Sequence, residues 1–90
     1  MSDWQQDKKR MLDRLRRIEG QVRGVMAMIE KEGECEPVVQ QFAATRKAMD
    51  RAFYELMACV TRRELAQLGV DHPQAEKCLD EVTSLLARYG

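Results

Sequence analysis

The sequence contains few of the residues that metal sites and disulfide frameworks need. It has one histidine, His72, and three cysteines, Cys35, Cys59 and Cys78, with no CxxC pair. Structural zinc takes four nitrogen or sulfur ligands, so a zinc site made by this chain alone is not expected. Three cysteines separated by 24 and 19 residues do not form a disulfide framework either, and we expect free thiols.

Catalytic motifs are missing as well. The chain has no Ser/His/Asp set, no glycine-rich phosphate loop and no HExxH motif, so we expect neither an enzyme nor a bound cofactor. His72 precedes Pro73, and we expect it to begin a helix at the surface. No run approaches the ~18 apolar residues of a membrane span. Because the N-terminal segment lacks the apolar stretch of a secretion signal, the expected location is the cytoplasm.

The charges balance overall but alternate along the chain. Fifteen basic residues offset fifteen acidic ones, which excludes a globally basic protein. Residues 1–24 and 42–63 each carry a net charge of +3, whereas residues 25–41 and 64–90 each carry −3. Such blocks are common on solvated helical surfaces, so they indicate a nucleic-acid partner only if the fold brings the two basic blocks together.

Hydrophobic periodicity predicts three helices, over residues 4–31, 37–67 and 73–89, in a single domain spanning 1–90. In the first two helices, apolar or small residues recur in alternating steps of four and three, as on the seam of packed helices. The two seams are Met11, Leu15, Ile18, Val22, Val25 and Ile29, and Val38, Phe42, Thr45, Met49, Ala52, Leu56 and Cys59.

Glycine and proline mark the expected helix ends. Gly33 is expected to close the first helix in the left-handed conformation, and Pro37 is expected at the first position of the second helix. Pro73 opens the third helix after the loop of residues 69–72.

The unequal helix lengths predict association. The second helix is about twice as long as the third, so a monomeric three-helix bundle would leave one end of an apolar seam uncovered. The first two helices should form an antiparallel hairpin, and two such hairpins would complete a four-helix bundle. We therefore expect an all-α homodimer, with the third helix able to mediate further assembly into a homotetramer.

Basic residues form a candidate DNA-binding set. Arg10, Arg14 and Arg17 share one face of the first helix by their spacing. In a hairpin that turns near residue 34, residue 17 lies opposite residue 51, so the two basic blocks become neighbours. Such a stripe can follow phosphates without a helix-turn-helix motif. The full candidate set is Lys8, Lys9, Arg10, Arg14, Arg17, Arg46 and Arg51.

The three thiols have different expected environments. Cys35 lies off the seams, between Glu34 and Glu36 at the start of the second helix. Cys59 falls on a seam and Cys78 precedes Leu79, so both are expected to pack in the interior as small hydrophobic residues. Cys35 is therefore the thiol most available for chemistry.

Two sequence runs and one cysteine carry a resemblance to a known family. The run RLRRIEGQVRG at 14–24, Cys35 and the run QQFAATR at 40–46 resemble the small all-helical repressors that sense copper, nickel/cobalt or formaldehyde, the CsoR/RcnR/FrmR family. The resemblance covers about residues 7–66 and, more weakly, the third helix. It implies a four-helix-bundle dimer, usually paired into a flat tetramer, that binds a double-stranded DNA operator and is released by a small-molecule effector at the cysteine.

The resemblance also implies where the effector binds, and there the sequence departs from the family. The family site joins the cysteine of one subunit to positions 25 and 29 residues further on in its partner, which are Val60 and Glu64 here. Copper-sensing members have His and Cys there and nickel/cobalt members supply histidines, whereas valine cannot ligate and copper(I) prefers soft ligands. Persulfide-sensing members need a cysteine where Glu64 stands. Cys59 is one residue short of the first position, or about 100° around the helix, and could join Cys35 only if the site geometry had shifted.

The formaldehyde-sensing branch is the most similar in the second run, and Glu64 suits it. That branch bridges its N-terminal residue to the cysteine, but it has proline where this chain has Ser2. The leading interpretation is a repressor released by a small aldehyde or another thiol-reactive effector at Cys35, with Ser2, Glu64 and Cys59 as candidate contributors and no metal site. The alternatives are a metal-responsive repressor of the same family and a helical protein-interaction module that does not bind DNA.

Overall fold

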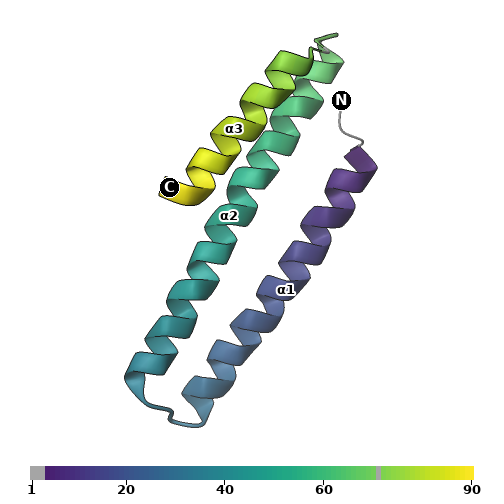
Figure 1. The fold of residues 1–90 in the computed structure, drawn as a ribbon. Coiled ribbons are helices and arrows are strands. Elements are labelled where there is room, and N and C mark those ends of the chain that lie inside the picture. Colours follow the sequence, from purple (N-terminus) through teal and green to yellow (C-terminus); the bar gives the residue numbers. More distant parts are fainter. Residues whose placement is uncertain (1–3, 71) are drawn as a thin grey trace.

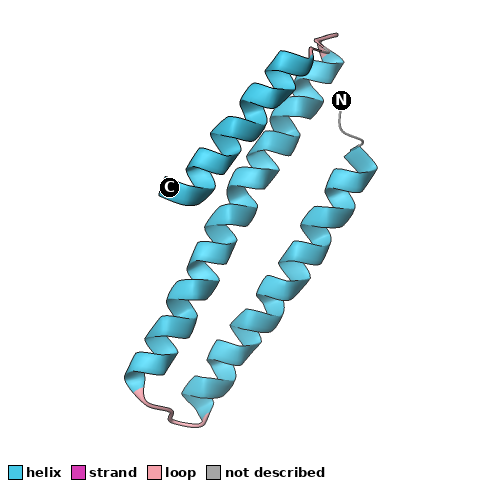
Figure 2. Ribbon diagram, in the orientation of Figure 1, coloured by secondary structure: helices cyan, strands magenta, loops and turns pink. Residues whose placement is uncertain are grey.

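Three helices make up the computed structural model, which describes residues 4–70 and 72–90. They are α1 (Trp4–Glu30), α2 (Cys35–Gln67) and α3 (Pro73–Tyr89), and no strand occurs among the described residues (Figure 2). The expected all-α class is confirmed. Each helix end lies within two residues of the position that the periodicity and the breakers predict.

The central element is α2. Helix α1 runs antiparallel to it on one side, and α3 folds back along its C-terminal half on the other (Figure 1). Within the described residues, α1 and α3 each pack against α2 and not against each other. The molecule measures 54 × 26 × 13 Å, so it is a flat slab with two broad faces and not a closed three-helix bundle.

Backbone hydrogen bonds close the turn between α1 and α2. The Glu32 N–H donates to the carbonyl of Ile29, and the Gly33 N–H donates to the carbonyl of Met28, each at 3.0 Å. This pair of bonds commonly ends a helix. Glu32 takes the left-handed conformation, with φ 54°, so the conformation predicted for Gly33 is wrong. Gly33 instead sits in a tight space, because a Cβ there would lie 3.3 Å from the Met28 carbonyl oxygen.

Helix α2 begins two residues earlier than predicted. Glu34 is its N-cap residue and Cys35 its first residue, so Pro37 occupies the third helical position and not the first. Proline is tolerated there because the first four amides of a helix have no carbonyl acceptor within it. The consequence is that Cys35 belongs to the helix itself, where its direction is set by the helical geometry.

His72 has the structural role that the sequence indicates. It is the exposed N-cap residue of α3, and its Nδ1 accepts a hydrogen bond from the Gln74 N–H at 3.2 Å. Capping satisfies one of the free amides at the helix start. The lone histidine of the chain is therefore explained by the fold.

Each apolar seam is divided between the inside and the outside of the hairpin. Alternate seam residues are buried between α1 and α2: Ile18, Val25, Thr45, Ala52 and Cys59. The seam residues between them, which we call the open apolar face, are 37% to 59% exposed: Leu15, Val22, Ile29, Phe42, Met49 and Leu56. Steps of four and three place successive residues on either side of the contact line, so a single partner helix covers only half of them.

The chain is too extended to enclose a core of its own. Its radius of gyration is 16.6 Å, whereas a compact domain of this length has about 12 Å. No large side chain among the described residues is completely buried. Because stable domains pack at least two layers of secondary structure, the open apolar face lacks its second layer in the single chain.

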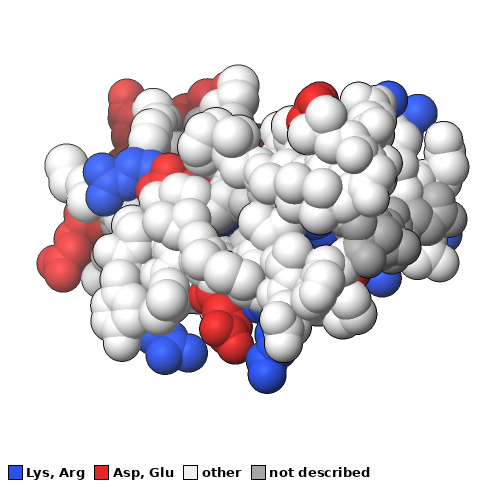
Figure 3. Space-filling view, turned by 90° about the horizontal axis from the view of Figure 1, so that it is seen from above, with Lys and Arg blue, Asp and Glu red and all other residues white. Residues whose placement is uncertain are grey.

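The end of the molecule seen in Figure 3 is mixed in charge. In the end-on view of Figure 3, basic and acidic side chains form small separate groups around a mostly uncharged surface. Among the described helices, none is long and apolar enough to cross a membrane.

Candidate functional site

Two arginines from different helices meet at one glutamate. The Arg14 Nε of α1 lies 2.9 Å from Glu55 Oε2, and the Arg51 Nε of α2 lies 3.6 Å from Glu55 Oε1. Residue 14 therefore faces residue 55, within one residue of the register predicted from a turn near residue 34. The two basic blocks are neighbours in space, as that register requires.

A polar hollow lies beside these arginines. It is a cavity of about 400 Å³ over α2, and Arg10 and Arg14 of α1 line one side of it. Glu55 and Arg62 of α2 form its floor, and Asp80 of α3 lies on the other side. Arg17 follows Arg10 by two helical turns on the same face of α1. We call Arg10, Arg14, Arg17 and Arg51 the basic face.

The remaining basic candidates are placed differently. Lys8 and Lys9 are exposed near the start of α1. Arg46 does not join the basic face, because it lines a separate apolar cavity of about 330 Å³ with Val22 and Met49 of the open apolar face. Five residues along a helix correspond to a rotation of about 140°, which separates Arg46 from Arg51. Residues that belong to one basic block in the sequence therefore do not all lie on one surface of the protein.

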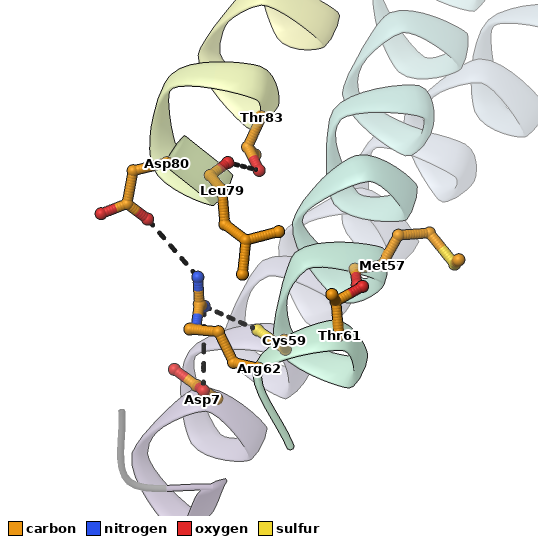
Figure 4. Close-up of polar contacts among 8 residues, drawn as sticks. All are labelled: Asp7, Met57, Cys59, Thr61, Arg62, Leu79, Asp80 and Thr83. Atoms are coloured by element: carbon orange, nitrogen blue, oxygen red, sulfur yellow. Dashed lines mark hydrogen bonds and ion pairs between the residues drawn. The ribbon is translucent and has the colours of Figure 1, made fainter. Parts of the chain in front are cut away.

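Sequence patterning did not single out Arg62, which links all three helices. Its side chain is 13% exposed, its Nη1 lies 3.4 Å from Asp80 Oδ1 of α3, and its Nη2 lies 3.9 Å from Asp7 Oδ2 of α1 (Figure 4). Asp7 is buried, and removing the partner of a buried charge is strongly destabilising. The sequence feature that could have revealed this cluster is Asp7, four residues before Met11. A carboxylate at seam spacing is buried by the fold, so it requires a buried partner.

Cys59 lies in the same buried cluster. Its Sγ accepts a hydrogen bond from the Arg62 Nη2 at 3.4 Å. Burial raises the pKa of the Cys59 thiol, the Asp7 carboxylate raises it further, and Arg62 opposes the rise. The thiol form therefore predominates at neutral pH, and only the thiolate is a good nucleophile. The interior position expected for Cys59 is confirmed.

Cys35 is exposed and lies on a different face of α2 from Cys59. Val60 and Glu64 follow Cys35 by 25 and 29 residues, which are close to seven and eight helical turns, so all three share one face. Along the helix they are about 38 and 44 Å from Cys35. One chain cannot bring these positions together, whereas a second α2 lying antiparallel could place its Val60 and Glu64 next to Cys35.

The remaining effector candidate is Ser2, and the third cysteine is Cys78. Ser2 lies outside the described residues. Cys78 is exposed on α3, so its expected interior position is wrong. The reason is that α3 has only α2 to pack against, and that contact covers one side of the helix. Within residues 4–70 and 72–90, no group of three or more His, Cys, Asp or Glu side chains is placed to hold a metal ion.

The sequence is similar to a known family of proteins. A family described as metal-sensitive transcriptional repressors matches residues 7–88. A protein from the bioA 5′ region of Serratia marcescens is 33% identical over 89 residues, covering 99% of this chain and 98% of the relative. The copper-sensing transcriptional repressor RicR of Mycobacterium tuberculosis is 38% identical over 88 residues, covering 92% of this chain and 88% of RicR.

Proposed function

Because the chain belongs to the family of metal-sensitive transcriptional repressors, we propose that it binds operator DNA through the basic face and is released by an effector acting at Cys35. The family consists of repressors and not of enzymes. The observation that supports this proposal best is the meeting of Arg14 and Arg51, from different helices, on one side of the hairpin. Phosphate contacts of this kind need no helix inserted into a groove.

We propose that a second copy covers the open apolar face. Six large apolar side chains are exposed on one face of a flat slab, and large exposed apolar patches mark sites of association. Two hairpins packed through these faces would form a four-helix bundle and supply the missing second layer. Helix α3 lies on the other side of α2 from α1, so it is free to mediate the pairing of dimers.

The assembly can be tested by light scattering. At micromolar concentration we expect a mass that is two or four times 10.4 kDa. Phe42→Glu should shift the mass towards the monomer and lower the unfolding temperature, because it places a charge on the open apolar face. Gln40→Glu, at an exposed position on the same helix, is the matched control and should leave the mass unchanged. A monodisperse wild-type monomer would contradict the proposal.

A dimer of this kind would also complete the effector site. Antiparallel packing of two α2 helices would set Cys35 of one copy near Val60 and Glu64 of the other. Valine has no donor atom and carboxylate is a hard ligand, so this set fits copper(I) poorly. We therefore propose a thiol-reactive effector. Formaldehyde, for example, adds across the Cys35 S–H bond to give S–CH2OH, and condensation of this adduct with a primary amine would form an S–CH2–N bridge and release water.

A copper effector is the second candidate. RicR, a copper-sensing repressor, is 38% identical to this chain over most of its length. Copper(I) binds thiolates strongly, and Cys35 is exposed. The two effectors make opposite predictions for metal affinity, so one titration separates them.

Copper(I) should not form a chelator-resistant complex with the wild-type protein, since one thiolate and one carboxylate cannot satisfy its coordination. The double substitution Val60→His with Glu64→Cys should acquire such a complex, because it supplies the two missing donors. Competition with a strong copper(I) chelator measures both affinities. A stoichiometric wild-type complex that is lost in Cys35→Ala would favour the copper candidate over the thiol-reactive one.

A further inference from the structure

The carboxylate of Glu55 contacts one arginine with each of its oxygens. Oε2 pairs with Arg14 of α1 at 2.9 Å, and Oε1 pairs with Arg51 of α2 at 3.6 Å. The Glu55 side chain is 31% exposed, against 32% for Arg14 and 60% for Arg51. One acidic residue therefore joins the two helices at the centre of the basic face.

Both arginines use the same nitrogen atom in these contacts. Each is held through its Nε, and no other ion pair holds either guanidinium within the described part of the chain. A guanidinium has five N–H donors, so one carboxylate shared by two arginines leaves both of them further donors for a phosphate. Glu55 thus lies on the Nε side of both guanidinium groups, at ion-pair distance from each.

We propose that Glu55 is a positioning residue that holds Arg14 and Arg51 as one phosphate-binding cradle on the basic face. This inference rests on the proposed DNA binding. Arginine side chains have many rotamers, and ordering them during association weakens binding. Glu55 orders two arginine side chains before the DNA binds, so that less side-chain entropy is lost on association.

The proposal makes a prediction opposite to that of charge alone. Glu55 places a negative charge on a face that binds a polyanion, so its removal should tighten DNA binding if only the net charge matters. If Glu55 positions the arginines, its removal should weaken binding although the protein becomes more positive. The sign of the change therefore decides between the two roles.

The experiment compares wild type with Glu55→Gln on a duplex selected from a random pool by the wild-type protein. We expect Glu55→Gln to bind about five- to tenfold more weakly, with unchanged helical circular dichroism and unchanged mass. Glu19→Gln is the matched control, because Glu19 lies on α1 and, among the residues that the structure describes, pairs with Arg23 at 3.8 Å and with neither arginine of the cradle. It should bind as tightly as wild type or slightly more tightly.

A double-mutant cycle makes the test specific. In an Arg51→Ala background, Glu55→Gln should weaken binding much less than in wild type, because the cradle is already broken. A Glu55→Gln protein that binds as well as or better than wild type would overturn the proposal. If Arg14→Ala and Arg51→Ala lose binding while Glu55→Gln does not, only the cradle fails. If those arginine variants also bind like wild type, the proposed DNA-binding face fails with it.

Discussion

Cys35→Ala should bind operator DNA as tightly as wild type and should no longer be released by the effector. Cys35 is exposed at the first position of α2 and takes no part in the basic face. An adduct at this position would add bulk where the partner helix is proposed to pack, and a small helix shift would misplace the arginines against the phosphates. A coupling free energy of about 1–3 kcal/mol between effector and DNA changes the DNA affinity by about 5–150-fold. Cys35→Ala should lose this entire change.

The other two thiols provide the controls. Cys59→Ala should still respond, because its thiol is buried with a raised pKa and faces α1. Cys78→Ala should respond as well, because Cys78 is exposed on α3, away from the proposed contact between α2 helices. Operator affinity is measured for each variant with and without formaldehyde. If formaldehyde still releases Cys35→Ala from the operator, or no longer releases Cys59→Ala, the sensing thiol is not Cys35.

Arg14→Ala and Arg51→Ala should each weaken operator binding by about tenfold or more. A charge-assisted hydrogen bond to phosphate contributes about 1.5–3 kcal/mol, and an assembly presents the contact once in each subunit. The folded state should tolerate both changes, since partly exposed ion pairs contribute about 0–1 kcal/mol to stability. Fluorescence anisotropy with a labelled duplex gives the affinities, and thermal unfolding gives the stability.

Arg23→Ala is the matched control for these variants. Arg23 lies on α1 with a 70% exposed side chain and forms an ion pair with Glu19, away from Glu55. It should bind nearly as tightly as wild type. Equal losses in Arg23→Ala and Arg14→Ala would mean that only the net charge matters and that the basic face has no defined geometry.

The hairpin could be predicted from the sequence because its determinants are local. The seams set the helix spans, and the short turn sets the register that brings Arg14 to Glu55. The conformations of Glu32 and Gly33 could not be predicted, because either residue can follow the helix. In the structure Glu32 takes the left-handed position, and Gly33 lies close to the Met28 carbonyl.

Side-chain environments were harder to predict than helices. The exposed position of Cys78 depends on how little of α3 is covered, which a period-based argument does not show. Arg46 and Arg51 belong to one basic block but lie on different faces of α2. The buried cluster around Arg62 forms where three helices meet. Its one sign in the sequence is Asp7, a carboxylate at the spacing of the apolar seam.

The salt dependence of operator binding tests the central claim most directly. The logarithm of the affinity should fall steeply and linearly with the logarithm of salt concentration, with a slope of about −0.9 for each phosphate contact. Arg51→Ala should have a shallower slope by about one for each subunit that contacts the duplex. If the wild-type slope is flat, or if Arg51→Ala has the same slope as wild type, the basic face does not bind the DNA backbone.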